Sequence, residues 1–368
     1  MTGSTTIDQG LVDDIEALVS CESPSADLDA VAQCAALVDA MAVRRIGTAA
    51  ERLVVDGRVH LRWQFGRPRV VIVGHLDTVW PIGTLARWPF TIDGDRMTGP
   101  GVFDMKSGLV QTFAALQAQD NLDGVAVLVT SDEEIGSTSS QQLIEDTCRG
   151  ARAALVLEPS ADGALKIARK GVGMFTVHVT GRAAHAGLEP HNGINATIEA
   201  AHQILAVAQL ARPDVGTTVT PTLLAAGTTV NTVPAAARIA VDVRAETTAE
   251  MTRVADALQA LTPTLTGAEV KTVAASVRQP LERAMSEELF ARANAHAQEL
   301  GLAVLDGVAV GGGSDGNLTA AIGVPTLDGL GAVGGNAHAE GEWASVSALP
   351  ERTALVAALV RDLLRETA

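Results

Sequence analysis

Two adjacent glutamates, Glu133 and Glu134, follow the apolar run VAVLVT at 125–130. The run is rich in β-branched residues, which favours a buried parallel strand. In open α/β sheets, the chemistry takes place beyond the carboxyl ends of the strands. Because neighbouring carboxylates repel each other there, a bound cation is the usual compensation. The alternative is that these acidic residues begin a helix, where they interact favourably with its dipole.

Other strand ends in the first half of the chain also carry polar residues. The apolar run at 69–74 is followed by a histidine, and the run at 153–158 ends on a glutamate. Because the carboxyl ends of parallel strands meet at one edge of a sheet, these residues can converge on one site. Five such residues lie at strand ends or in glycine-rich loops: His75, Asp104, Glu134, Glu158 and His338.

Two imidazoles and three carboxylates form a set of nitrogen and oxygen ligands that suits zinc, with manganese or cobalt as substitutes. Five protein ligands exceed what one catalytic zinc normally takes, so two metals that share one carboxylate use the set economically. Asp77 can accept the other ring N–H of His75 and fix its tautomer. Glu133 is left as the general base beside a metal-activated water.

The composition excludes several classes of protein. The 368 residues are 47% hydrophobic and 19% charged, which is typical of a chain with a substantial core. The net charge of −16 argues against nonspecific binding to nucleic acid or anionic membranes. Three scattered cysteines do not form a disulfide framework. The chain has no tyrosine, so an oxyanion donor must be another residue type.

Strand, loop and helix patterns alternate up to about residue 168, which predicts a mostly parallel α/β sheet. From 173 to 181 apolar and polar residues alternate, and an antiparallel α+β pattern continues to about 278. We therefore expect an α/β catalytic domain at 1–168 and 279–368. An inserted α+β domain at 169–278 interrupts it.

Neither a secretory leader nor a membrane-spanning segment is expected. The N-terminal residues MTGSTTIDQG lack a basic region followed by an apolar one, and no apolar run reaches membrane-spanning length. These features predict a cytoplasmic protein.

Eight stretches in this sequence resemble one family of enzymes. They are GHLDTV at 74–79, GPGVFDMKSG at 99–108, TSDEEIGS at 130–137, LEPS at 157–160, GRAAHAG at 181–187, NTVPAAARIAVDVR at 231–244, GGGSDG at 311–316 and NAHAEGEW at 336–343. The family is that of the cocatalytic zinc peptidases and deacylases, which includes glutamate carboxypeptidase, acetylornithine deacetylase, succinyl-diaminopimelate desuccinylase and aminoacylase. The glutamate carboxypeptidase branch is the most similar.

The resemblance implies a role for each residue of the cluster. His75, Asp104 and Glu158 would hold one zinc ion, and Asp104, Glu134 and His338 the other. Asp104 would bridge the two ions, and the peptide bond that follows it would be cis. Asp77 would orient His75, and Glu133 would be the general base that passes its proton to the leaving nitrogen.

The resemblance also explains the inserted domain, which in this family is a lid and dimerisation domain. His185 would enter the active site of the partner subunit in a homodimer and stabilise the oxyanion. Asn231, Arg244 and Arg278 match lid positions that hold a substrate carboxylate in relatives. Arginine suits this role because it binds a carboxylate through two hydrogen bonds. Arg244 could equally be a structural salt-bridge partner.

The expected activity is zinc-dependent hydrolysis of an amide bond next to a free carboxylate, as in glutamate carboxypeptidase. The rival within this class is deacylation of an N-acyl amino acid, which would use the same catalytic residues. Outside this class, a noncatalytic dimeric binding protein on the same fold would lack Glu133 or a ligand. A nucleotide-binding enzyme would need a phosphate-binding lysine that GGGSDG does not contain.

Overall fold

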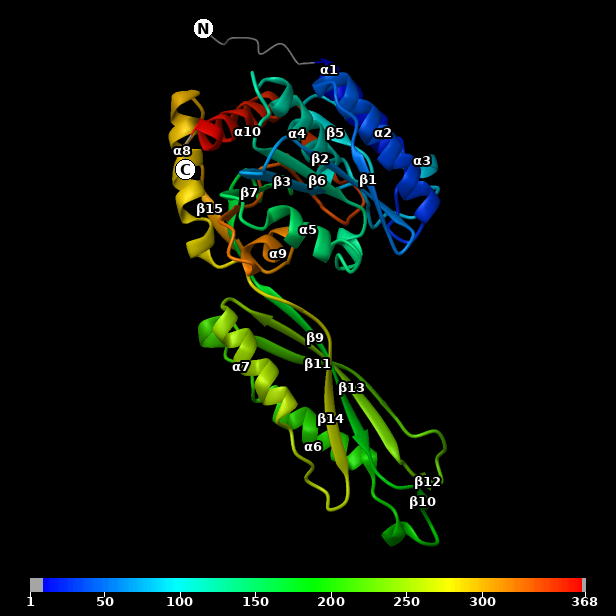
Figure 1. Ribbon diagram of the computed structural model, residues 1–368. Helices are drawn as coiled ribbons and strands as arrows, with labels where there is room; N and C mark the ends of the chain where they lie inside the picture. The colour runs from blue at the N-terminus through cyan, green and yellow to red at the C-terminus, as the bar shows by residue number, and fades with distance from the viewer. Residues whose placement is uncertain (1–8, 366–368) are drawn as a thin grey trace. The chain divides into compact units, whose positions relative to one another are not determined.

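Two units make up the chain in the computed structural model, which describes residues 9–365 (Figure 1). Unit 1 comprises the described residues up to Ile167, Arg283–Ala309 and the described residues from Ser314 onward. Unit 2 comprises Ala168–Glu282 and Val310–Gly313. The catalytic and lid roles expected of the two parts of the chain remain predictions. Our expectations for residues 1–8 lie outside the described residues.

A six-stranded sheet with the order β1-β2-β6-β3-β7-β16 forms the centre of unit 1. From β6 to β16, neighbouring strands are parallel, whereas β2 is antiparallel to both β1 and β6. The predicted α/β class with a mainly parallel sheet is confirmed. The strands are β1 (Glu51–Val55), β2 (Arg58–Gln64), β3 (Val70–His75), β6 (Val125–Thr130), β7 (Ala153–Val156) and β16 (Thr326–Leu327).

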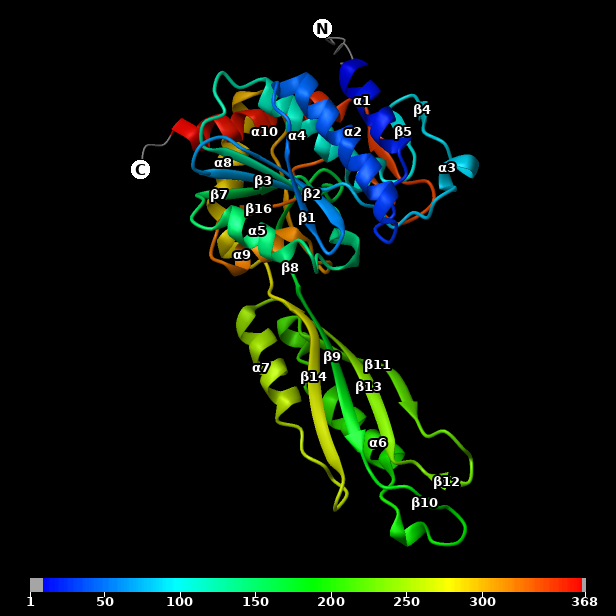
Figure 2. The ribbon, with the colours of Figure 1, turned by 45° about the vertical axis from the view of Figure 1, so that its right-hand side comes forward.

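Helices cover both faces of this sheet (Figure 2). Every residue of β3, β6 and β7 is buried, because each face of these largely apolar strands packs against a helical layer. One layer contains α1 (Gln9–Val19), α2 (Leu28–Ile46), α4 (Ser107–Gln117), α8 (Glu287–Glu299) and α10 (Ala348–Arg365). The other contains α5 (Gln141–Cys148) and α9 (Asp315–Ala321).

Short strands and one short helix complete unit 1. The loops that follow the main strands form a small antiparallel sheet with the order β17-β18-β5-β4, and β8 pairs with β15. These elements are α3 (Thr84–Arg87), β4 (Thr91–Asp93), β5 (Arg96–Thr98), β8 (Leu165–Arg169), β15 (Gly307–Val310), β17 (Gly334–Gly335) and β18 (Trp343–Ser345). The small sheet fixes loops that were predicted only as glycine-rich and irregular.

Unit 2 contains an antiparallel sheet with the order β11-β13-β9-β14, packed against two helices. Alternate residues of β9 are buried, as the alternating pattern in this part of the sequence predicts. A separate strand pair joins β10 to β12. The elements are β9 (Gly171–Thr180), β10 (Ala184–His185), α6 (Ala196–Ala208), β11 (Thr218–Ala226), β12 (Thr232–Val233), β13 (Ala236–Ala245), α7 (Thr248–Gln259) and β14 (Glu269–Arg278).

Among the described residues, no helix combines the length and the apolar character needed to cross a membrane.

Candidate metal centre

The five predicted ligands all come from loops and strand ends of unit 1. His75 is the last residue of β3, Glu134 lies in the turn after β6, and Glu158 follows β7. Asp104 lies in the turn before α4, and His338 lies between β17 and β18. The parallel order β6-β3-β7 brings the first three strand ends to one edge of the sheet.

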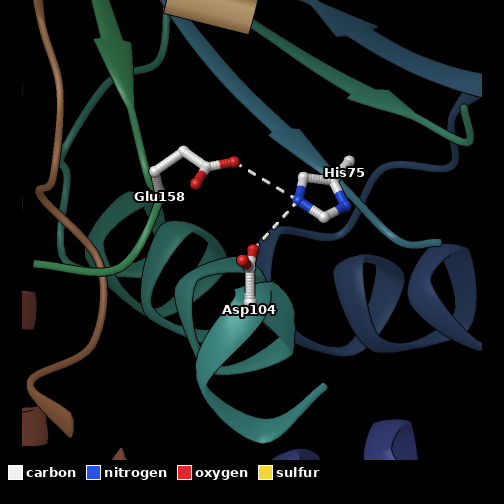
Figure 3. Close-up of side chains that lie close together, drawn as sticks. All are labelled: His75, Asp104 and Glu158. Carbon is white, nitrogen blue, oxygen red and sulfur yellow. Dashed lines mark hydrogen bonds and ion pairs between the residues drawn. The ribbon is translucent and has the colours of Figure 1, made fainter. Parts of the chain in front are cut away.

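One group of donor atoms consists of His75, Asp104 and Glu158 (Figure 3). The Nε2 atom of His75 lies 3.3 Å from Asp104 Oδ1 and 3.3 Å from Glu158 Oε1. The His75 side chain is 2% exposed, so this group is shielded from solvent. The peptide bond between Asp104 and Met105 is cis, as the resemblance implied.

A second group consists of Asp104, Glu134 and His338. The Nε2 atom of His338 lies 3.3 Å from Asp104 Oδ2 and 3.1 Å from Glu134 Oε2. Asp104 therefore faces one histidine with each of its carboxylate oxygens. A single carboxylate belongs to both groups, which is the arrangement that two neighbouring cations would need.

The charges at this site are mutually dependent. Contacts with Asp104 and Glu134 raise the pKa of His338 to about 10. Burial disfavours the Asp104 anion, but hydrogen bonds from His338 and His75 outweigh it and hold the pKa of Asp104 below its usual range. Burial raises the pKa of Glu134. The pKa values of the histidines and carboxylates in this cluster therefore depend on one another.

The donor atoms fit divalent metals. The Oε1 atom of Glu134 is buried and has no hydrogen-bond partner among the described residues. Leaving a buried carboxylate oxygen unpaired is costly, and a cation would satisfy it. Imidazole nitrogens and carboxylate oxygens are ligands that zinc, cobalt and manganese accept.

Asp77 contacts the ring of His75 and accepts hydrogen bonds from the backbone of Glu133 and Glu134. The Nδ1 atom of His75 lies 3.0 Å from the Asp77 carbonyl oxygen and 3.4 Å from its carboxylate Oδ1. The Asp77 carboxylate also accepts the backbone N–H groups of Glu133 and Glu134, at 3.3 and 3.2 Å. The sequence suggested only the contact with His75. The contact with the glutamates joins loops that are 56 residues apart.

Two buried aspartates that sequence reasoning did not single out support the same loop. Asp132 accepts both the N–H and the hydroxyl of Ser139 at 2.7 Å. Asp315 accepts the hydroxyl groups of Thr130 and Ser137 from its place at the start of α9. The GGGSDG motif therefore contributes a buried carboxylate that binds residues on either side of the two glutamates.

The predicted lid residues lie in unit 2 and form two separate pairs. His185 is in β10, and the backbone N–H of the next residue bonds to the carbonyl of Asn231. The Nδ1 atom of His185 accepts the N–H groups of Gly187 and Leu188, both at 3.1 Å. A neutral His185 ring therefore carries its proton on Nε2 and can donate from that atom.

Arg244 and Arg278 form the other pair, on the two strands that flank Val172 in the sheet. Arg244 makes a bidentate ion pair with Asp242 at 3.0 Å, which is the structural alternative considered for this residue. The start of β13 lies beside the opposite end of β9, where Ala236 pairs with Thr180. From Val172 to Thr180, β9 extends for about 26 Å at ~3.3 Å per residue.

The chain is similar to known proteins in both sequence and fold. The sequence model of "Peptidase family M20/M25/M40" matches residues 71–362. Carboxypeptidase G2 of Pseudomonas sp. (strain RS-16) is 29% identical over 369 residues, which cover 95% of this chain and 88% of that protein. Succinyl-diaminopimelate desuccinylase 2 of Shewanella loihica is 32% identical over 161 residues, covering 39% of this chain and 42% of that protein.

The fold is also found in solved structures. Aminopeptidase PepT from Bacillus cereus aligns with a TM-score of 0.76 and 22% identity, over 98% of this chain and 100% of that chain. At this identity the alignment establishes a shared fold.

Proposed function

Since the chain belongs to peptidase family M20/M25/M40 and is therefore a hydrolase of a metal-dependent family, we propose that it cleaves an amide bond next to a free carboxylate. The model for this activity is the related carboxypeptidase G2. One observation carries the proposal: two groups of side chains that could each hold a metal ion share Asp104, and Glu133 is adjacent in the chain to Glu134 of one group.

We propose that each subunit holds two zinc ions, with cobalt or manganese as substitutes. His75, Asp104 and Glu158 would bind one ion, and Asp104, Glu134 and His338 the other. When bound, the ions supply Lewis-acid chemistry, making a water more acidic and a carbonyl carbon more electrophilic.

Glu133 is the proposed general base. It is adjacent to a proposed ligand but belongs to neither donor group, and Asp77 fixes its backbone N–H. Its carboxylate would take a proton from the water that attacks the scissile carbonyl carbon. As the carbon–nitrogen bond breaks, the same carboxyl group would give this proton to the leaving nitrogen. The products are a carboxylate and a free amine.

His185 is the proposed donor to the oxyanion, in the active site of a partner subunit. The two backbone N–H groups at Nδ1 support this role, because they leave the Nε2 proton available to a developing negative charge.

The substrate carboxylate would be held by Asn231 and Arg278, and by Arg244 only if its guanidinium exchanges Asp242 for the substrate. The distance between Asn231 and the two arginines within unit 2 limits which of them can contact the same substrate molecule. Asn231 precedes by five residues the start of β13, which pairs with Thr180 of β9. The two arginines flank Val172, about 26 Å away along β9. Residues from both ends can reach one small substrate only if they come from different copies of the chain. This separation supports the proposal of a homodimer.

Replacing His185 with alanine is expected to lower kcat by about 10²–10³-fold, which is typical for the loss of one oxyanion donor. Zinc content should not change, because His185 is in neither donor group. Initial rates and metal analysis would test this. The matched control is His191→Ala, which removes another exposed histidine of the same unit. An unchanged kcat in His185→Ala would rule out the oxyanion role.

A mixture of two inactive variants would test the subunit assignment. Dimers that contain one His185→Ala chain and one Glu133→Gln chain would have one complete site if His185 acts in its partner. Such a mixture, refolded together, should regain part of the wild-type activity. No recovery, with mixed dimers demonstrated by differential tagging, would mean that His185 does not act across the dimer.

The second candidate activity is deacylation of N-acyl amino acids, which the similarity to a succinyl-diaminopimelate desuccinylase favours. Both activities would use the same catalytic groups, so a substrate panel must separate them. We expect zinc-loaded protein to release free amino acid from at least one C-terminal dipeptide or N-acyl amino acid. Chelator-stripped protein should release none, and added zinc should restore the activity.

The preferred member of the panel would decide between carboxypeptidase and deacylase. Preference for an N-acylated glutamate or a C-terminal dipeptide would favour the first, and preference for a succinyl or acetyl diamino acid the second. Turnover that survives complete metal removal would contradict the proposed mechanism.

A further inference from the structure

Glu342 is a buried carboxylate close to the metal centre to which the proposed mechanism gives no role. It lies four positions after His338, and none of its surface is exposed. Its Oε1 atom accepts the backbone N–H groups of Phe103 and Asp104, at 2.8 and 2.9 Å. Its Oε2 atom accepts the N–H of Gly101 at 3.1 Å and the indole N–H of Trp80 at 2.9 Å. Four donors thus surround one carboxylate.

The loop before Asp104 is shaped to present these N–H groups. Gly99 and Gly101 have φ values of 152° and 74°, a backbone region that favours glycine. A methyl carbon built on Gly101 would lie 2.6 Å from Thr78 Cγ2, so this position has no room for a side chain. Successive N–H groups that converge in this way form an anion-binding concavity, here filled by the chain's own glutamate.

The contacts of Glu342 require a carboxylate and not merely a side chain of the same size. A carboxylate has only acceptor oxygens, so it can satisfy all four donors. Each oxygen of Glu342 accepts two N–H groups, so the NH₂ group of a glutamine would face two N–H donors in place of one oxygen. Burial raises the pKa of Glu342, and the N–H groups of Asp104, Phe103 and Gly101 and the Trp80 indole oppose that shift.

Glu342 also joins the segments that carry the proposed ligands. Trp80 belongs to the loop that begins at His75, and the accepted N–H groups belong to the loop of Asp104. Glu342 itself continues the segment of His338, and its carbonyl accepts the N–H of Gly99 at 3.4 Å. The next residues form β18, which pairs with β5 just before that loop.

We infer that Glu342 is a positioning residue that fixes Asp104 relative to His338 and thereby sets the affinity of the site for its metals. The inference depends on the proposed function, since it takes Asp104 as the ligand common to both metals. Residues that orient metal ligands typically change metal affinity about 10–100-fold when they are replaced.

The test is the zinc affinity of Glu342→Gln, measured by competition with a chromogenic chelator. We expect the variant to bind zinc about 10–100-fold more weakly than wild type. The matched control is Glu340→Gln, which makes the same change of charge two residues away on an exposed side chain and should bind zinc like wild type. Excess zinc should restore much of the lost kcat and leave KM unchanged.

A purely structural role would give a different result. Glu342→Gln would then unfold at a lower temperature in its metal-free form, but the folded protein would bind zinc with unchanged affinity. That outcome would overturn the inference. If Glu342→Gln does not fold, Trp80→Phe serves instead, because it removes one of the four donors and keeps a ring. A severalfold loss of zinc affinity in Trp80→Phe would support the inference, and an unchanged affinity would contradict it.

Failure of this inference and failure of the proposed function would be distinguishable. A wild-type protein that binds two zinc ions but hydrolyses no member of the substrate panel would count against the function alone. A wild-type protein that hydrolyses its substrate, together with a Glu342→Gln variant of unchanged zinc affinity, would count against the inference alone.

Discussion

Replacing Glu133 with glutamine is expected to abolish hydrolysis and leave both zinc ions bound. Glutamine keeps the size of the side chain but cannot take a proton from water. Positioned general bases typically contribute about 10²–10⁴-fold to the rate, so kcat should fall by at least about 10²-fold. Glu133 belongs to neither donor group, and its backbone N–H, which the substitution keeps, makes the contact with Asp77.

The measurement pairs initial rates, on whichever substrate the panel identifies, with zinc analysis of the same protein sample. Glu340→Gln is again the control for loss of one negative charge, and it should keep full activity. Full activity in Glu133→Gln would rule out the assignment of the base. Loss of zinc from Glu133→Gln would instead mean that this residue is a ligand.

The strand ends of the metal centre could be predicted because their signal is local. β3, β6 and β7 are short apolar runs, and the polar residue at or just after the end of each run is visible in the sequence. Parallel pairing then brings His75, Glu134 and Glu158 to one edge. Asp104 and His338 have no such local signal beyond glycine-rich loops. The small sheet of β17, β18, β5 and β4 that fixes these loops was not predicted.

One missed hairpin did have a signal in the sequence. β1 and β2 are joined by Asp56 and Gly57, whose φ values are 50° and 80°. An Asp-Gly pair between two apolar-polar alternations is a strong indication of a two-residue hairpin turn. The antiparallel edge of the main sheet, which this hairpin forms, was not predicted.

The supporting carboxylates could not be predicted, because their partners are distant in the sequence. Glu342 binds N–H groups 238 to 241 positions earlier, and Asp315 binds a hydroxyl 185 positions earlier. No periodicity marks such contacts, and an acidic residue in a loop is usually solvated. The separation of the lid residues depends in the same way on strand register, which pairs Arg278 with Val172 and the start of β13, five residues after Asn231, with Thr180.

Replacing Asp104 with asparagine is expected to remove both zinc ions at once. Each of its carboxylate oxygens faces a different histidine, at 3.3 Å in both cases. The asparagine side chain keeps one oxygen but has no charge. Its NH₂ group would point at either His75 or His338, where the carboxylate had an oxygen. Hydrolysis should then fall to background. Zinc stoichiometry, measured after gel filtration at a fixed free zinc concentration, checks the result.

The comparison with single-site ligands makes this prediction specific to a shared carboxylate. His338→Ala should lose the zinc of one group, because His338 contacts Asp104 and Glu134 but not Glu158. Glu158→Gln should lose the zinc of the other group. His338→Ala and Glu158→Gln should each lose one zinc ion per chain. If Asp104→Asn also lost only one zinc ion, Asp104 would be a ligand of a single ion. The two groups would then be independent sites, and the proposal that Asp104 is shared by two ions would be wrong.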